Sequence, residues 1–215
     1  MAVKGPSIAG KSFLVEKCIG LLPQSTYYAL SAMSEKALAC SQEPMSHRHL
    51  VIYEAVGLGS EFAQYLMRSF LSEGRIRYET VEQTKEGLKP RLIEREGPTG
   101  LVVTTTRAGL HPENETRILS LEVGDSLDQT MAVILAHGKG EEPKSVDPAP
   151  FQALQRILGL EPPQVVIPYA EPLALGCNTA AVRLRRDFPM VLCLVKAPAR
   201  FPRDGSCQPI SHIVG

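Results

Sequence analysis

The octapeptide Gly5-Pro6-Ser7-Ile8-Ala9-Gly10-Lys11-Ser12 constrains this chain more than any other segment, because it is a complete G-x-x-x-x-G-K-[ST] phosphate-binding loop. In such a loop the glycines let backbone N–H groups turn toward phosphate oxygens. The lysine reaches the β- and γ-phosphates, and the serine hydroxyl ligates Mg²⁺. The helix predicted to begin at Lys11 adds its positive N-terminal end to the same anion site. The loop therefore predicts nucleotide binding where a strand passes into a helix.

Composition limits the remaining possibilities. A chain of 215 residues holds one α/β domain, or one domain and a small appendage. Lys plus Arg and Asp plus Glu both total 23, so any basic surface must be local. No apolar run reaches the roughly 18–20 residues of a membrane span, and residues 1–4 are no signal peptide, so we expect a cytoplasmic protein without membrane contact. The five scattered cysteines form no C-x-x-C pair, which predicts reduced thiols.

Apolar runs alternate with helical spacing along the chain. Strands are predicted over residues 27–30, 50–53, 101–106 and 118–123, and helices over 11–22, 34–40, 61–71, 126–136 and 151–158. A short extended run at 165–167 and a basic helix over 180–195, interrupted at Pro189, follow, while His47 and His49 are interpreted as loop residues. This order predicts an α/β fold with a mostly parallel sheet, helices on both faces, and ligand at the carboxyl ends of the strands.

Two charged segments, 75–82 and 89–94, flank a turn-rich stretch at 83–87 and predict a β-hairpin. Its basic residues are Arg75, Arg77, Lys85, Lys89, Arg91 and Arg95, and its acidic residues are Glu79, Glu82, Glu86, Glu94 and Glu96. One interpretation is a hairpin whose tip, with Lys85 and Lys89, holds nucleic-acid phosphates. The other is a solvated hairpin whose opposite charges pair across the strands.

Hydrolysis of a nucleotide requires an acid at the end of a second strand, and Glu54 follows the apolar run at 50–53. In the usual pattern an Asp precedes this Glu and holds the water shell of the metal, whereas here the preceding residue is Tyr53. Glu54 is therefore predicted to orient or activate the attacking water alone. The alternative is a glutamate that merely caps the next loop.

Two further polar residues are candidates for the same chemistry. Thr106 ends the 101–106 strand and is predicted to contact the γ-phosphate or the attacking water. Arg117 follows a polar turn and is predicted to be an arginine finger that enters the site of a neighbouring subunit, with a solvated surface charge as the alternative.

The order of these motifs resembles the AAA+ branch of phosphate-loop ATPases. The loop at 5–12, the acid strand at 50–54 and the polar strand end at 104–106 follow that family's order, and the hairpin lies where minichromosome-maintenance helicases carry a DNA-touching hairpin. Residues 182–197 resemble the lid helix that carries a second sensor arginine, here Arg186. The segments 30–37 and 91–100 resemble ATP-binding, primase/helicase-like proteins of bacteria and their mobile elements.

The resemblance implies a P-loop NTPase three-layer sandwich with an inserted β-hairpin and a partial helical lid. It divides the chain into a core at 1–138 with its hairpin at 75–95, a linker at 139–150, a lid region at 151–197 and an irregular tail at 198–215. ATP and Mg²⁺ are the implied cofactors, with Ser12 on the metal. The implied nucleotide-binding residues are Gly5, Pro6, Ser7, Ile8, Ala9, Gly10, Lys11, Ser12, Phe13 and Arg186.

The implied function is ATP binding and hydrolysis in a protein of DNA replication or unwinding that works as a homo-oligomeric ring. Lys11, Glu54, Thr106 and Arg117 would carry the hydrolysis, and DNA would be the partner. The short segment before Gly5 and the proline-rich tail indicate a copy shortened at both ends. Two alternatives remain open: a non-hydrolysing nucleotide-dependent switch, which Tyr53 favours, and a small-molecule kinase, which shares the loop.

Overall fold

The computed structural model describes residues 1–34, 36–54, 60–85, 87–98, 100–106, 112–140, 145–160, 164–178 and 180–200. The chain divides into two compact units, Met1–Gln155 and Arg156–Gly215. This division falls inside a helix at Ala149–Leu160. The sequence instead places a linker at 139–150, and those domain boundaries stay a prediction.

A five-stranded parallel sheet forms the centre of the first unit and confirms the predicted α/β class. Its strands lie in the order β2-β3-β6-β1-β7. Their bounds are β1 Ala2–Lys4, β2 Tyr27–Leu30, β3 His49–Ile52, β6 Gly100–Thr105 and β7 Ser120–Glu122. The predicted strands are thus confirmed to within a few residues, but His49 begins β3 and is not a loop residue. The runs of β3 and β6 are mostly apolar because both faces of the sheet are covered there, whereas all three residues of the edge strand β7 are exposed.

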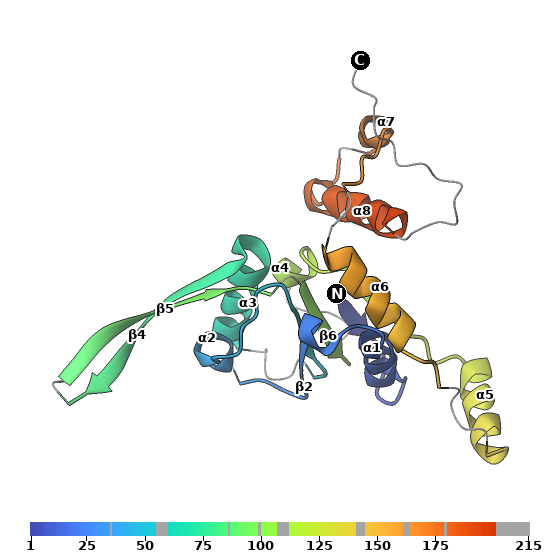
Figure 1. Ribbon diagram of the computed structural model, residues 1–215, viewed down its shortest axis with the longest axis horizontal. Coiled ribbons are helices and arrows are strands. Elements are labelled where there is room, and N and C mark those ends of the chain that lie inside the picture. Colours follow the sequence, from blue (N-terminus) through green and yellow to red (C-terminus); the bar gives the residue numbers. More distant parts are fainter. Residues whose placement is uncertain are drawn as a thin grey trace. The chain divides into compact units, whose positions relative to one another are not determined.

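Helices cover both faces of this sheet, as predicted, and make three layers. Helix α1, Lys11–Gly20, packs Val15 and Ile19 against Val3 and Val51 on one face. The opposite face carries α2, Ala37–Cys40, and α3, Glu61–Glu73. Figure 1 shows α1 and α3 on opposite sides of the strands. On the α3 side the core consists mainly of Leu38, Met45, Leu50, Ile52, Leu66, Phe70, Leu101 and Val103.

Helix α1 buries only part of its apolar residues. Val15 and Ile19 are buried, whereas Phe13, Leu14 and Cys18 are exposed. The helix enters from Gly10, whose φ of 83° lies in the left-handed region that glycine adopts readily. This entry sets the rotation of α1, which side-chain spacing alone does not specify.

The predicted hairpin is present as a long ribbon, drawn in green in Figure 1. It consists of β4, Arg75–Thr84, and β5, Gly87–Glu96, paired antiparallel in continuous register. Thr84 pairs with Gly87, so the turn is shorter than the predicted 83–87. At its base Ile76 is fully buried, and Tyr78 meets Phe62 of α3 edge to face with ring centroids 5.0 Å apart.

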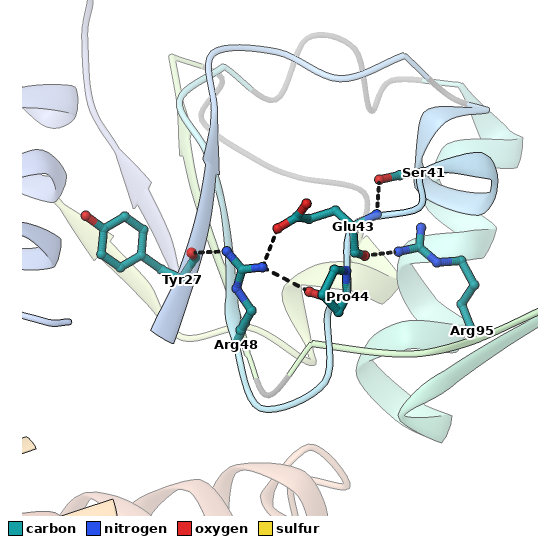
Figure 2. A network of polar contacts seen from close by, with 6 residues as sticks. All are labelled: Tyr27, Ser41, Glu43, Pro44, Arg48 and Arg95. Carbon is teal, nitrogen blue, oxygen red and sulfur yellow. Dashed lines mark hydrogen bonds and ion pairs between the residues drawn. The ribbon is translucent and has the colours of Figure 1, made fainter. Parts of the chain in front are cut away.

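Two arginines fasten the ribbon and β2 to the loop at 41–48 (Figure 2). Arg95 of β5 donates hydrogen bonds to the backbone carbonyls of Leu38 and Glu43. Arg48 donates to the carbonyl of Tyr27 at 2.8 Å and pairs with the Glu43 carboxylate. Burial lowers the pKa of Arg95, although the neighbouring Cys40 and Glu43 oppose that shift. The guanidinium groups thus supply donors that a loop without regular structure requires.

The remaining helices are α4 Pro112–Glu115, α5 Leu127–Gly138, α6 Ala149–Leu160, α7 Ala170–Leu175 and α8 Leu184–Ala199. No residue of α5, α6, α7 or α8 is buried. The predicted extended run at 165–167 is not a strand, and α7 was not predicted. Helix α8 continues through Pro189 and Pro198, so the predicted interruption at Pro189 is wrong. In an exposed helix, water can replace the hydrogen bond that proline does not donate.

Candidate functional site

The predicted site residues gather at the carboxyl edge of the parallel sheet, because each follows the end of a strand. Lys4, the last residue of β1, pairs with Thr105 of β6 on one side and with Glu122 of β7 on the other. On the far side of β6, Ile52 of β3 pairs with Val103. The polar end of β6 therefore lies between the phosphate-binding loop after β1 and Glu54 after β3.

The loop itself combines one close backbone approach with one strained residue. A Cβ atom on Gly5 would lie 2.7 Å from the carbonyl oxygen of Val123, so only glycine fits beside the end of β7. Ile8 is fully exposed and has a φ of 72°, a conformation that β-branched residues rarely adopt. Strain of this kind clusters at ligand-binding loops. The loop thus has the irregular backbone that the motif predicts.

The helix that follows the loop presents its first N–H groups at the same edge. Leu14 makes the first helical hydrogen bond, from its N–H to the carbonyl of Gly10 at 2.9 Å. By helix geometry the N–H groups of Lys11, Ser12 and Phe13 have no acceptor within α1. They and the positive end of the helix dipole can stabilise a phosphate.

The ammonium of Lys11 is directed back over the loop. It donates to the carbonyl of Gly5 at 2.9 Å and to that of Pro6, and the residue is buried, with 8% of its surface exposed. These carbonyls hold the cation next to the loop backbone. Anionic phosphate oxygens are stronger acceptors than neutral carbonyls, so they can compete for the same ammonium.

Glu54 is exposed at the end of β3, and its N–H donates to the carbonyl of Ser31 at 3.1 Å. Tyr53, which stands at the position of the usual Asp, packs partly buried on the α1 side of the sheet. Burial, followed by the charge of Glu16 and the nearby Tyr27, raises the pKa of the Tyr53 phenol. Tyr53 therefore stays neutral at physiological pH, and of these two residues only Glu54 supplies a carboxylate.

The three threonines at the end of β6 differ in what they contact. Thr104 is buried and donates its hydroxyl to the carbonyl of Tyr53, which joins the ends of β6 and β3. Thr105 is also buried, whereas Thr106 is exposed. By the alternation of a strand, Thr104 and Thr106 fall on the face that α1 covers. Of the three threonines, Thr106 is therefore the one outside the core, and it lies on the α1 face of the sheet, where the phosphate-binding loop is.

Arg117 lies away from the loop of its own chain. It precedes β7 by three residues and donates to the hydroxyl of Ser72, near the end of α3. Helix α3 leaves the carboxyl edge after β3 and returns to the edge where the strands begin. Two residues before Arg117, Glu115 forms an ion pair with the buried Lys4 of β1. No local sequence pattern indicates this ion pair, because its residues lie far apart in the chain.

The register of the ribbon places the two candidate nucleic-acid contacts, Lys85 and Lys89, in different positions. Lys85 is exposed in the turn, whereas Lys89 is exposed in β5 opposite Glu82 and is not a tip residue. Several other charges pair within the ribbon, as the alternative interpretation expects: Arg77 with Glu94, and Arg91 with Glu82 at 3.1 Å. An open groove of about 880 Å³ lies between the loop at 41–46 and the face of the ribbon that carries Arg91 and Arg95. No local sequence pattern indicates this groove, because its two sides are far apart in the chain.

Two predicted nucleotide contacts remain. Phe13 is 55% exposed in the first turn of α1, where Lys17 lies over its ring at 5.2 Å from the centroid. Arg186 is exposed in the first turn of α8, within the second unit, where Arg183 pairs with Asp187 at 2.9 Å. The role of Arg186 stays a prediction.

No protein-family model matches the chain, and no curated protein sequence matches it. Within the part of the chain that the structure describes, no group of three or more His, Cys, Asp and Glu side chains could hold a metal ion. Over the same residues, no helix has the length and apolar character needed to cross a membrane.

Proposed function

We propose that this chain is an ATP-binding and ATP-hydrolysing module of AAA+ type that serves DNA replication or unwinding. The observation that carries the proposal is the strand order of the sheet. It aligns the loop after β1, the threonines at the end of β6 and Glu54 after β3 along one edge. Hydrolysis of a bound triphosphate needs a loop that binds the phosphates, a carboxylate that orients the water, and a polar side chain between the two.

In this proposal each residue has one task. The N–H groups at the start of α1 bind the β-phosphate, and Lys11 exchanges its contacts with Gly5 and Pro6 for the β- and γ-phosphates. Glu54 orients the attacking water and receives its proton, and Thr106 hydrogen-bonds on the γ-phosphate side. Arg117 points away from its own loop, which supports a role across a subunit interface in a ring.

The chain also offers donors suited to Mg²⁺, which prefers hard oxygen ligands and commonly takes few of them from protein. Ser12 is exposed at the first turn of α1, and Glu54 is an exposed carboxylate. Mg²⁺ bound with ATP would neutralise charge on the phosphates. Its protein ligand would be Ser12, and Glu54 would act through the water.

The proposal is tested by steady-state ATP hydrolysis with Mg²⁺, with and without single-stranded DNA. Lys11→Ala should abolish binding and turnover, and Glu54→Gln should retain binding but lower kcat at least about 100-fold. Lys17→Ala, in the exposed face of the same helix, is the matched control and should change neither. Absence of ATP binding by the unaltered chain would overturn the proposal.

The DNA part has a separate readout. Lys85 is the exposed cation at the ribbon turn, and phosphate contacts of this kind weaken steeply with salt. Lys85→Ala should reduce retention on single-stranded DNA at low salt and leave ATP affinity unchanged. Equal retention of both proteins would remove the ribbon tip from the DNA contact.

One observation favours a second candidate, a nucleotide-dependent switch without turnover. Tyr53 is a neutral phenol packed into the α1 side of the sheet, and its backbone carbonyl is taken by Thr104. It supplies no charge to the metal. Tight ATP binding that Lys11→Ala abolishes, together with no hydrolysis and no effect of Glu54→Gln, would support the switch.

A further inference from the structure

Helix α8, drawn in red in Figure 1, concentrates positive charge in a chain whose formal net charge is zero. From its N-cap Arg183 to its C-cap Arg200 it has five basic residues and one acidic residue. The acidic residue, Asp187, pairs with Arg183 at 2.9 Å. The excess positive charge therefore comes from the other four basic residues, Arg185, Arg186, Lys196 and Arg200.

These four residues lie on one face of the helix. At about 100° per residue, they fall within an arc of about 100° around the helix axis, and Asp187 falls outside it. Arg185, Arg186 and Arg200 are exposed. Lys196 is half-buried, which a lysine tolerates because its long side chain can carry the ammonium to water. We name this group of four residues the basic face of α8.

The apolar residues Leu184, Phe188, Leu192 and Val195 gather in a different arc of the same helix. They fall within about 80° of one another, and their arc does not overlap that of the basic face. All four are half-buried. Helix α8 is thus partly covered on this apolar side and open to water on the side that carries the cations.

The stability of the helix explains only one half of the basic face. Lys196 and Arg200 lie near the C-terminal end, where the helix dipole favours cations. Arg185 and Arg186 lie in the first turn, where the positive end of the dipole disfavours them. A bound anion would offset this cost. The fold by itself gives no reason for the arginines in the first turn.

The spacing of the cations favours an extended polyanion over a single small anion. Arg185 and Lys196 are separated by about 16 Å along the helix axis. A nucleic-acid duplex carries one negative charge per about 1.7 Å, so one backbone along α8 meets both pairs of cations. Among residues 183–200, all of which the structure describes, the aromatic residue is Phe188, and it lies in the apolar arc. The basic face therefore has no ring on which an unpaired base could stack, which favours a duplex over a single strand.

An anionic membrane surface fits this arrangement less well. A helix that lies in the membrane interface buries its apolar face among the lipids. In α8 the residues that would enter the lipid, such as Phe188 and Leu192, are already half-buried in the protein. The side that is open to water is the basic face, which matches a partner that offers charge alone.

We propose that the basic face of α8 binds the phosphate backbone of a nucleic-acid duplex, without dependence on base sequence. The pair in the first turn and the pair at the C-terminal end contact separate phosphates of that backbone. This site goes beyond the proposed function, because it involves neither the phosphate-binding loop nor the ribbon tip and requires no nucleotide. Arg186 has a predicted role at the nucleotide, so the variants below leave it unchanged.

The test is the fluorescence anisotropy of a short, labelled DNA duplex of mixed sequence, titrated with the full chain at several salt concentrations. The triple variant Arg185→Gln, Lys196→Gln and Arg200→Gln should bind the duplex at least about 100-fold more weakly at low salt. Its slope of log K against log salt concentration should be smaller by about 2–3, since each phosphate contact contributes about 0.9. Glutamine preserves helix propensity, so α8 should remain helical.

The matched control removes the same charge from other parts of the surface. The exposed residues Lys17, Lys36 and Arg156, each changed to Gln, should alter the affinity less than about threefold, because salt screens charges that make no contact. Equal effects of the two triple variants, or no duplex binding by the unaltered chain at low salt, would overturn the proposal. So would binding of phosphatidylserine vesicles in place of the duplex, or duplex binding that Lys85→Ala abolishes and the α8 variant retains.

ATP binding separates this proposal from the proposed function. The α8 variant should bind ATP as tightly as the unaltered chain does, because the phosphate-binding loop is unchanged. Loss of duplex binding with ATP binding intact supports the basic face. A chain that bound the duplex through α8 but bound no ATP would overturn the proposed function alone.

Cys193 provides a second test, which needs no substitution. It is exposed and lies within the arc of the basic face, between the two pairs of cations. Bound duplex should therefore slow its alkylation by a maleimide, and a raised salt concentration should restore the rate. Cys18, exposed in α1, is the internal control and should react equally with and without the duplex. Mass spectrometry measures both sites, and equal protection of the two thiols, or none at saturating duplex, would contradict the proposal.

Discussion

The central sheet and the helices after it differ in how their apolar residues are used. In β1, β3 and β6, Ala2, Val51 and Val103 are at most 1% exposed, and side chains from α1 and α3 cover them. In α5 the residues Leu127 and Ile134 are 87% and 59% exposed, and none of α5, α6, α7 and α8 contains a buried residue.

This difference shows where the free energy of folding originates. Burial of apolar surface fixes the register of the sheet and, through it, the edge where the candidate site lies. The helices are instead held by backbone hydrogen bonds and, in α5, by a side-chain cap, and such interactions are marginal for short helices in water. Substitutions in the sheet should therefore change global stability, and matched substitutions in the helices should act locally.

The largest contrast is expected for two phenylalanines. Phe70 in α3 is 2% exposed and packs against the sheet, whereas Phe151 in α6 is 46% exposed. Phe70→Ala should lower the free energy of unfolding by about 3–5 kcal/mol, because it leaves a cavity. Phe151→Ala should cost less than about 1 kcal/mol. Urea denaturation measures both, and equal losses would mean that α6 is buried in solution.

Two ion pairs give the next contrast. Glu115→Gln leaves the Lys4 ammonium, whose side chain is 9% exposed, without its charged partner. We expect a loss of about 2–3 kcal/mol in the free energy of unfolding, since Glu115 is itself partly exposed. Asp187→Asn breaks the pair with Arg183, the N-cap residue of α8, whose side chain is 58% exposed, and should cost about 0.5 kcal/mol or less. Raising the salt concentration should erase only the second effect.

The serine caps of two helices sharpen the comparison. Ser60 accepts a hydrogen bond from the N–H of Ala63 in α3, and Ser126 accepts one from the N–H of Gln129 in α5. Ser60→Ala should lower global stability by about 1 kcal/mol. Ser126→Ala should leave the unfolding midpoint unchanged and accelerate amide exchange only within α5. A global effect of Ser126→Ala would show that α5 unfolds together with the sheet.

The last contrast is a dependence of stability on pH that belongs to the sheet. Burial, then the positive charge of the Met1 amino group, lowers the pKa of His49 below its ordinary 6.5. Burial also lowers the pKa of the Met1 amino group, from 8.0 to about 6. Both groups bind fewer protons in the folded state, so stability should fall as the pH decreases from 8 through 6.5 and below.

His49→Gln removes only the histidine contribution. It should flatten the decline below pH 6.5 by an amount under about 1 kcal/mol and leave the decline between pH 8 and 6.5 in place. Urea midpoints measured at intervals across this range test the prediction. An unchanged profile below pH 6.5 would show that His49 is not the responsible group.

Sequence predicted the centre of the sheet well because β3 and β6 are mostly apolar runs. Residues 50–53 and 101–106 have no other stable placement than the centre of a parallel sheet, and parallel connections bring their ends to one edge. The positions of Glu54 and Thr106 beside the phosphate-binding loop follow from that topology. The chemistry proposed for them stays a prediction.

The remaining features depend on contacts between distant parts of the chain. The rotation of α1 is set by the backbone at Gly10, and the contact of Arg117 with Ser72 joins segments 45 residues apart. Helix α8 continues through Pro189 because the helix is exposed. Water can therefore supply the hydrogen bond that the proline nitrogen does not donate, which a buried helix would lack. None of these is encoded in local periodicity.

The close approach of Gly5 to Val123 changes how a mutational screen of the loop should be interpreted. A methyl group at Gly5 would meet the backbone of Val123 at 2.7 Å, whereas nothing lies within 4 Å of a Cβ added at Gly10. Substitutions at Gly5 would thus be eliminated in a selection for folded protein before ligand affinity was tested. Survivors at Gly10 would report the cost of its backbone conformation and the affinity for ligand. Substitutions at the two glycines of one motif would therefore be lost at different stages of the same selection, those at Gly5 at folding and those at Gly10 at ligand binding.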